Sequence, residues 1–260
     1  MLFIFFILYL LVCGLLYLSQ EKLIFFPDKL DKNYSFNFHQ QFEEVTIKSF
    51  DGCLLHGLLF KTTSPKGLVF YLHGNGGALD SWGDVARTYT DLHYDIFMLD
   101  YRGYGKSEGK ITGQEQQFRD MQIVYDELKK KYNENKIIIL GYSIGTGLAS
   151  KLASTNHPRL LILQAPYFSL TNIMMRRTWY TIPSFILKYK LETNQYISKC
   201  KMPIVIFHGD QDEVIDYRSA LKLKKLLKPN DIFITLHGQG HSNMTDNTEY
   251  QAALKKIIEG

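Results

Sequence analysis

A serine with a glycine two positions away on each side stands between an apolar run and a segment of helical period. The stretch Ile137–Gly145 ends in Gly-Tyr-Ser-Ile-Gly, which is G-x-S-x-G in the strand-turn-helix context that the motif requires. In so tight a turn, a Cβ at Gly141 or Gly145 would collide with neighbouring backbone. The turn leaves the Ser143 hydroxyl exposed as a nucleophile. It also aims the amide of Ile144 at the place where an attacked carbonyl gains negative charge.

A nucleophilic serine needs a general base and a carboxylate that orients the base, which follow it in the order Ser, Asp or Glu, His. The candidate base is His241, which comes after flexible glycines and before the last helical segment. The candidate acid is Asp212, beyond the apolar run Ile204–Phe207, and Asp210 is its rival. The sequence therefore predicts a triad in which His241 takes the proton of Ser143 and Asp212 holds the imidazole.

A glycine-rich turn, His73-Gly74-Asn75-Gly76-Gly77, follows the apolar run Leu68–Leu72. An exposed amide in such a turn can supply a second hydrogen bond to an oxyanion, and we expect the amide of Asn75 to do so. The alternative is a phosphate-binding loop. The spacing fits neither G-x-G-x-x-G nor a Walker sequence, and no Lys-Ser or Lys-Thr follows.

The elements that must position these residues alternate between strands and helices. Glu43–Phe50 alternates apolar with polar residues, Asp51-Gly52 is a hairpin turn signal, and Cys53–Lys61 is the returning strand. Later strands are expected at Leu68–Leu72, Ile96–Leu99, Ile137–Leu140, Leu160–Leu163 and Ile204–Phe207, and helices at Leu79–Leu92, Gln114–Tyr132, Ile144–Thr155, Tyr217–Leu227 and Thr248–Ile258. This order predicts an α/β fold with a mainly parallel sheet, an antiparallel N-terminal hairpin and helices on both faces. The site is expected at the carboxyl ends of the strands.

One interval, at about 167–200, is longer than a simple crossover and rich in Met and aromatic residues. We expect it to form a short cap over the site. The side chains expected to line the substrate site are Tyr142, Phe168, Met174 and Trp179. A stripe of this composition is as compatible with ordinary packing as with substrate lining, and a lid can serve both purposes.

The N-terminus is an uncharged apolar stretch, Met1–Ser19, and a helix needs roughly 20 such residues to cross a bilayer. A cleaved signal peptide differs in its basic start, shorter apolar core and small-x-small cleavage site. A buried core helix is a further alternative, but this run is apolar on all sides and lacks an N-cap. We expect a single-pass transmembrane anchor at 1–19, a connector at 20–42 and a catalytic domain at 43–260, with the side of the membrane left open.

Composition narrows the class of protein. A chain of 260 residues with 45% hydrophobic residues suits one compact domain. The net charge of +4 comes without a block of like charge, so no nucleic-acid partner is expected. Cys13, Cys53 and Cys200 are too widely separated to indicate a disulfide framework or a zinc site, and no metal is expected.

Six motifs in this order resemble the α/β-hydrolase superfamily, and within it the small membrane-anchored branch of α/β-hydrolase domain-containing serine hydrolases. They are Gln20–Pro27, His73–Gly76, Asp100–Gly109, Gly141–Gly145, His208–Asp212 and Gly240-His241. The resemblance implies an α/β-hydrolase fold and favours the second Asp of H-G-D-x-D, Asp212, as the catalytic acid. One departure is Ile215 after Val214, where the family usually has Pro. The resemblance also implies esterase, lipase or thioesterase activity without a cofactor.

These expectations combine into one function. We expect an acyl-enzyme on Ser143 in the hydrolysis of a carboxylic ester or thioester. The apolar cap and the anchor favour a hydrophobic acyl substrate, a lipid or an acylated protein, presented at the bilayer. Two alternatives remain: a serine peptidase on the same fold, and a non-catalytic membrane-tethered binding module.

Overall fold

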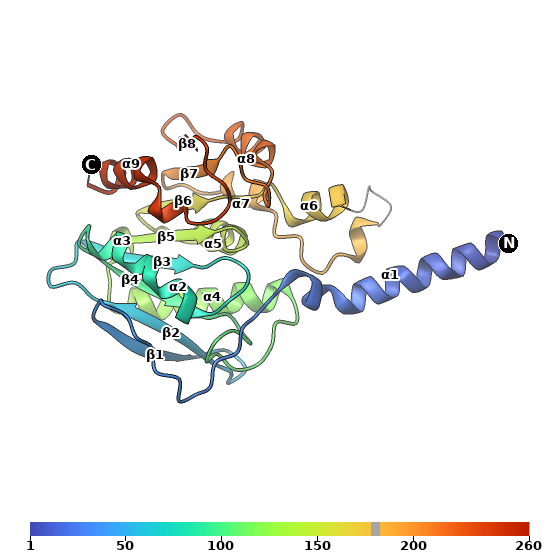
Figure 1. Cartoon of the computed structure of the whole chain (residues 1–260), viewed down its shortest axis with the longest axis horizontal. Helices are drawn as coiled ribbons and strands as arrows, with labels where there is room; N and C mark the ends of the chain where they lie inside the picture. The colour runs from blue at the N-terminus through green and yellow to red at the C-terminus, as the bar shows by residue number, and fades with distance from the viewer. Residues whose placement is uncertain (178–182, 260) are drawn as a thin grey trace.

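The computed structural model describes residues 1–177 and 183–259. Within them a single sheet runs in the order β1-β2-β4-β3-β5-β6-β7-β8 (Figure 1). Its strands are β1 (Phe42–Lys48), β2 (Leu54–Phe60), β3 (Gly67–Leu72), β4 (Tyr94–Leu99), β5 (Ile137–Tyr142), β6 (Leu160–Gln164), β7 (Ile204–Gly209) and β8 (Ile232–Leu236). Strand β2 pairs antiparallel with both β1 and β4, and the remaining pairs are parallel. The predicted mainly parallel sheet with an antiparallel N-terminal hairpin is confirmed.

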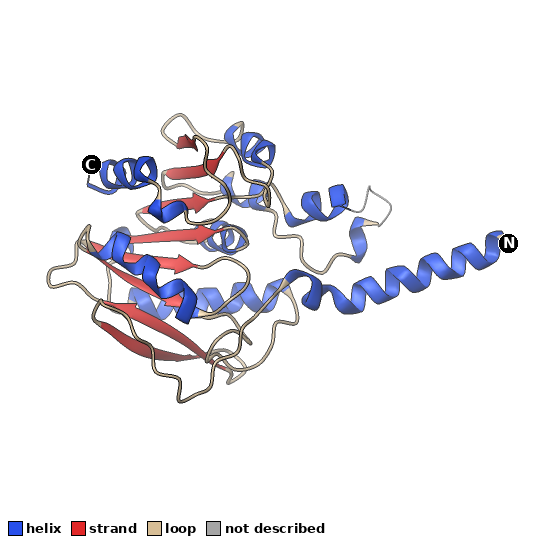
Figure 2. Ribbon diagram, viewed as in Figure 1, coloured by secondary structure: helices blue, strands red, loops and turns tan. Residues whose placement is uncertain are grey.

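Helices cover both faces of the sheet, as Figure 2 shows. Their bounds are α1 (Leu2–Ile24), α2 (Leu79–Trp82), α3 (Ala86–Thr90), α4 (Gln114–Lys129), α5 (Gly145–Ala153), α6 (Leu170–Arg177), α7 (Thr193–Ile197), α8 (Tyr217–Lys224) and α9 (Thr248–Glu259). Helices α4, α5, α7 and α8 contribute to one hydrophobic core, and α2, α3 and α9 to the other. Four 3-10 turns complete the described elements: η1 (Gly83–Val85), η2 (Glu134–Lys136), η3 (Ser184–Ile186) and η4 (Met244–Asp246).

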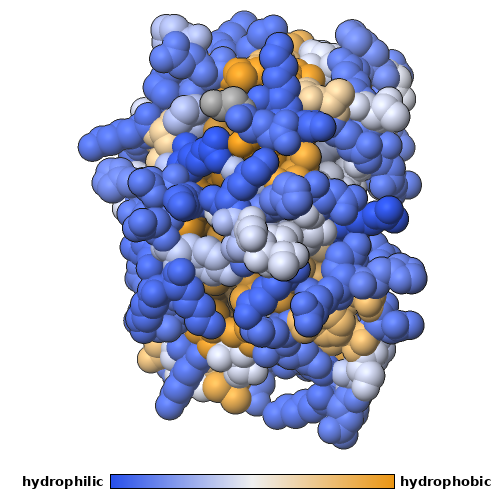
Figure 3. Space-filling model, turned by 90° about the vertical axis from the view of Figure 1, so that its left-hand side faces the viewer, coloured by the Kyte–Doolittle hydropathy of each residue, from blue (hydrophilic) through white to orange (hydrophobic). Residues whose placement is uncertain are grey.

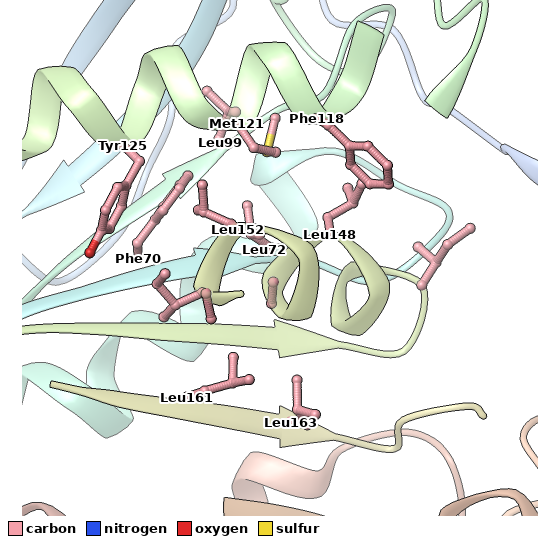
Figure 4. Packing of buried hydrophobic residues seen from close by; sticks show 14 of the residues in the cluster. Phe70, Leu72, Leu99, Phe118, Met121, Tyr125, Leu148, Leu152, Leu161 and Leu163 are labelled. Carbon is pink, nitrogen blue, oxygen red and sulfur yellow. The ribbon is translucent and has the colours of Figure 1, made fainter. Parts of the chain in front are cut away.

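The central strands are apolar throughout because the cores lie on opposite faces of the sheet. In β3, Leu68, Phe70 and Leu72 point into the core beneath α4 and α5, whereas Val69 and Tyr71 point into the core beneath α3 and α9. Successive side chains of a strand alternate between faces, so a strand buried on both sides reads as a continuous apolar run. Figure 4 shows Phe70 and Leu72 packed with Tyr125, Leu148 and Leu152. Full burial of each such side chain contributes about 1.5–3 kcal/mol.

The helical segment expected at Leu79–Leu92 is helical from Leu79 to Thr90, but it is not one regular α-helix. A 3-10 turn, η1, separates α2 from α3 and begins at Gly83. The ring of Phe38 lies so close to Gly83 that a Cβ there would overlap it. The chain thus uses glycine where an aromatic ring from the connector meets the helix, and glycine also weakens the helix at that point.

Helix α1 projects away from the rest of the molecule (Figure 1). Among its residues only Cys13, Gln20 and Ile24 are buried. By length and composition the helix could cross a membrane. It runs to Ile24, beyond the expected end at Ser19, and stops just before Pro27 because the residue preceding a proline disfavours helical backbone.

The carboxyl ends of β3, β5, β6 and β7 point toward the side from which α1 leaves (Figures 1 and 2). The opposite side of the molecule is mainly hydrophilic, with scattered apolar patches (Figure 3). Helix α6 and the turn η3, which belong to the expected cap, lie on the same side as α1. The sheet edge that carries the site residues therefore faces α1.

Candidate active site

Ser143 occupies the turn between β5 and α5 in strained backbone. Its φ is +51°, in the left-handed region that residues other than glycine seldom adopt. A strained turn persists only where its surroundings hold it. Here the neighbouring strand β6 does so, because the amide of Ser143 donates to the carbonyl of Gln164 at 2.9 Å. A Cβ at Gly141 would lie 2.6 Å from the carbonyl oxygen of Gly145, and one at Gly145 would lie 2.7 Å from the carbonyl oxygen of His73. Both glycines are therefore required by the turn, as predicted.

The three residues predicted to form a triad lie in one hydrogen-bonded chain. The Ser143 hydroxyl is 3.0 Å from Nε2 of His241, and Nδ1 of His241 is 2.7 Å from Oδ2 of Asp212. The serine follows β5, the aspartate follows β7 and the histidine follows β8, so parallel strands from the same half of the sheet bring them together at its carboxyl end. With Asp212 accepting from Nδ1–H, Nε2 is left to accept the serine proton.

Asp212 is held as a carboxylate. Its Oδ1 accepts the amides of Val214 at 2.9 Å and Ile215 at 2.8 Å. Burial by itself would raise the pKa of this carboxyl, but hydrogen bonds from His208, His241 and the Ile215 amide outweigh burial and hold the pKa well below its usual range. A negative charge thus lies permanently beside the imidazole.

The rival acid, Asp210, makes different contacts. Its carboxylate is 3.0 Å from Nδ1 of His237 and accepts the amide of Gly238 at 2.8 Å. These contacts fix the loop between β8 and His241. The geometry therefore gives Asp212 the contact with the candidate base and Asp210 a contact that stiffens the neighbouring turn.

The two expected oxyanion donors lie directly after Ser143 in the chain and in the loop after β3. Among the hydrogen bonds of the described residues, neither the amide of Asn75 nor that of Ile144 donates to another protein group. Asn75 lies in the glycine loop, defined as His73–Gly77, whose last two residues have φ of +78° and +75°. A Cβ at Gly145 would overlap the backbone of Leu72, so this loop packs directly against the start of α5.

The four side chains expected to line the substrate site have different surroundings. The hydroxyl of Tyr142 donates to the carbonyl of His241, and its ring packs 5.4 Å from that of Trp82. Phe168 packs against the core on the α4 side. Met174 lines a small apolar cavity of about 40 Å³ between α1 and the cap, together with Leu16, Leu23, Met175, Ile186 and Leu187. Trp179 lies outside the described residues.

Three further contacts support the candidate triad. His208 places Nε2 at 3.3 Å from Oδ2 of Asp212 and at 2.8 Å from the carbonyl of Ile215, so it braces the acid loop. Tyr142 fixes the backbone of the candidate base. The Asn75 side chain bonds to the end of α1. Only His208 carried a signal, because the H-G-D-x-D motif puts it four residues before the acid.

The fold and this arrangement define a class of protein. A family model described as serine aminopeptidase, S33, matches residues 63–191. The esterase Pf2001 of Pyrococcus furiosus has a similar structure, with a TM-score of 0.71 at 18% identity over 91% of this chain and 97% of that one. Est1E of Butyrivibrio proteoclasticus has a TM-score of 0.64 at 19% identity over 83% of this chain and 97% of that one. The chain has the α/β-hydrolase fold, and these comparisons support the α/β-hydrolase superfamily and, within it, the α/β-hydrolase domain-containing type.

Curated relatives of this type agree. Alpha/beta hydrolase domain-containing protein 17C of Xenopus tropicalis is 29% identical over 210 residues, which cover 78% of this chain and 65% of that protein. The human protein 17B is 29% identical over 208 residues, covering 77% of this chain and 69% of the relative. The aligned part thus spans about two thirds of the relatives' length.

Proposed function

We propose that this chain is a serine hydrolase that cleaves a carboxylic ester or thioester through an acyl-enzyme on Ser143. The observation that carries the proposal is the continuous hydrogen-bonded chain from the Ser143 hydroxyl through His241 to Asp212. His241 removes the serine proton as the oxygen attacks the acyl carbonyl, and then gives that proton to the leaving alcohol or thiol. The Asn75 and Ile144 amides stabilise the oxyanion. Water, activated by the same histidine, releases the acid.

The substrate class follows from what surrounds the site. The carboxyl ends of the parallel strands face α1 and the cap, and the small cavity between those two elements is lined by apolar side chains and by Gln20. Helix α1 is proposed as a single-pass anchor, residues 20–42 as a connector, and residues 43–260 as the catalytic domain with its cap at about 167–200. In that arrangement the site opens on the side of the bilayer. A lipid or an acylated protein presents its acyl group there, so we propose a hydrophobic acyl substrate.

The test is hydrolysis of p-nitrophenyl butyrate, octanoate and palmitate by the full chain in detergent micelles. Parent activity that disappears in Ser143→Ala supports the proposal, because loss of the nucleophile removes nearly all chemistry. Ser198→Ala is the matched control, because the exposed Ser198 hydroxyl makes only a local hydrogen bond, which it donates to the carbonyl of Gln195. A folded parent chain that hydrolyses none of the esters contradicts the proposal and favours a binding module.

The description of the matching family model favours a second candidate, a serine peptidase. The same triad attacks an amide, and the difference lies in the protonation of a poorer leaving group and in the pocket. Turnover of aminoacyl-p-nitroanilides compared with p-nitrophenyl esters separates the two. We expect a higher kcat/KM for the esters, and the reverse order identifies a peptidase.

A further inference from the structure

The motif Gln20–Pro27 joins α1 to the catalytic domain, and no step of the proposed reaction uses it. Its residues lie at the C-terminal end of α1 and in the first extended residues beyond it. Two parts of the domain make hydrogen bonds to this junction. One is the glycine loop, and the other is the cap strap, defined as residues 186–189.

The side chain of Asn75 connects the glycine loop to the junction. Its Nδ2 donates to the carbonyl of Ile24, and its Oδ1 accepts the amide of Phe26 at 3.2 Å. The same Oδ1 accepts the hydroxyl of Tyr104 at 2.8 Å and the amide of Gly76 at 3.1 Å. The carboxamide therefore uses both its donor and its acceptor, which an alanine or a carboxylate at this position cannot do.

Backbone contacts extend this connection. The amide of Asp28 donates to the carbonyl of Gly77 at 3.2 Å, and Pro27 pairs with Gly77 in a parallel bridge. The amide of Gly105 donates to the carbonyl of Asp28 at 2.7 Å. The junction is thus inserted between the glycine loop and the loop that carries Tyr104.

The cap strap is held by the other end of the junction. Gln20 donates to the carbonyl of Ile186 at 2.8 Å and accepts the amide of Lys188 at 2.8 Å. Glu21 accepts the hydroxyl of Tyr189 at 3.0 Å and pairs with the Lys188 ammonium at 3.2 Å. Gln20 is only 2% exposed, although most of α1 is exposed. A buried carboxamide with both of its functions bonded to one strap fixes that strap relative to the helix.

The glycine loop needs such external support. Gly76 and Gly77 follow Asn75 with positive φ, and glycine has no Cβ to restrict its backbone. An oxyanion donor works only within a few tenths of an ångström of its place, and a misplacement of about 1 Å can cost on the order of a hundredfold in rate. We propose that the junction is a positioning element: through the Asn75 side chain it fixes the oxyanion donor, and through Gln20 and Glu21 it fixes the cap.

This inference rests on the proposed hydrolase, and its consequence is that the base of α1 acts on turnover itself. Asn75→Ala keeps the backbone amide that binds the oxyanion and removes only the side-chain bonds. In the full chain we expect kcat for p-nitrophenyl butyrate to fall about tenfold to a hundredfold, with KM within about twofold of the parent. A kcat within about twofold of the parent overturns the proposal.

A second pair of variants removes one hydroxyl each. Tyr104→Phe takes away the bond to Asn75, and we expect kcat to fall about threefold. Tyr132→Phe is the matched control, because that hydroxyl donates to Asp95 at 2.7 Å away from the junction. Equal kcat values for the two variants contradict the proposal even if Asn75→Ala does not fold. Gln20→Ala, which frees the cap strap, is expected to raise KM for the palmitate ester with little change in kcat for the butyrate.

Hydrogen exchange separates this inference from the proposed function. A parent chain without esterase activity refutes the function. The positioning role is then decided by the amide of Asp28, which donates to the carbonyl of Gly77 at 3.2 Å and which we expect to exchange at least about tenfold faster in Asn75→Ala than in the parent. Unchanged exchange of this amide overturns the positioning role whatever the activity.

Discussion

Replacement of Asp212 tests most sharply whether this carboxylate sets the tautomer of the His241 imidazole. In Asp212→Asn the shape is kept, but a carboxylate that accepts from Nδ1–H of His241 becomes a carboxamide that can donate to it. The imidazole then carries its proton on Nε2, which lies 3.0 Å from the Ser143 hydroxyl, and it can no longer accept the serine proton. A triad that loses this tautomer loses about 10⁴ in kcat, or about 5 kcal/mol of the barrier.

The matched control is Asp210→Asn, the same change two residues away. Its carboxylate contacts His237 and Gly238 and not the candidate base, so we expect kcat within about threefold of the parent. The assay is the steady-state hydrolysis of p-nitrophenyl butyrate at neutral pH, with near-UV circular dichroism to verify the fold. Comparable losses in both variants, or a larger loss in Asp210→Asn, would refute the assignment of the acid.

The remaining predictions concern stability, membrane insertion and pH. Gly145→Ala forces a Cβ into the backbone of Leu72, and we expect a loss of about 1–3 kcal/mol and a Tm lower by about 2–12 °C, whereas Gly14→Ala, which has open space around it, leaves the Tm unchanged. Arg102→Met leaves the buried carboxylate of Asp120 without its cationic partner at 2.6 Å and with the Ser49 hydroxyl as its remaining donor, which should lower the free energy of unfolding in urea by about 3–5 kcal/mol. Leu10→Arg places a charge in α1 at a cost of about 2.5–3.5 kcal/mol, so carbonate extraction should release more of this variant from membranes than of the parent. The pKa of Asp212 is lowered on folding, so its contribution to stability is present above about pH 4 and lost as the pH falls below that; the stability difference between parent and Asp212→Asn should shrink between pH 5 and pH 3, and a constant difference would contradict the depressed pKa.

Local patterns were sufficient to predict most of the sheet and the spacing of the candidate triad. The apolar run Ile137–Leu140 predicts a strand, and Gly141 and Gly145 predict a tight turn after it. Both signals lie within ten residues of Ser143. The same holds for the acid, because His208, Gly209 and Asp212 form one turn at the end of β7. Such features depend only on residues that are close in the sequence, so they can be predicted from it.

Contacts between distant segments could not be read in this way. The bond from Asn75 to Ile24 joins residues 51 positions apart, and the bond from Gln20 to Ile186 joins residues 166 positions apart. Gly83 appears in the sequence as one glycine within a helical pattern, and only the fold shows the ring of Phe38 that excludes a Cβ at this position. The sequence shows which residue types are present, but which residues contact one another depends on how the sheet brings distant segments together.

The most direct measurement is to identify the residue that becomes covalently modified. The full chain in detergent is treated with a fluorophosphonate, digested and analysed by mass spectrometry, in parallel with Ser143→Ala and His241→Ala. We expect one phosphonylated serine, Ser143, in the parent, no label in Ser143→Ala, and a labelling rate at least about a hundredfold lower in His241→Ala. A folded parent that carries the label on another serine, or carries none, would contradict this expectation.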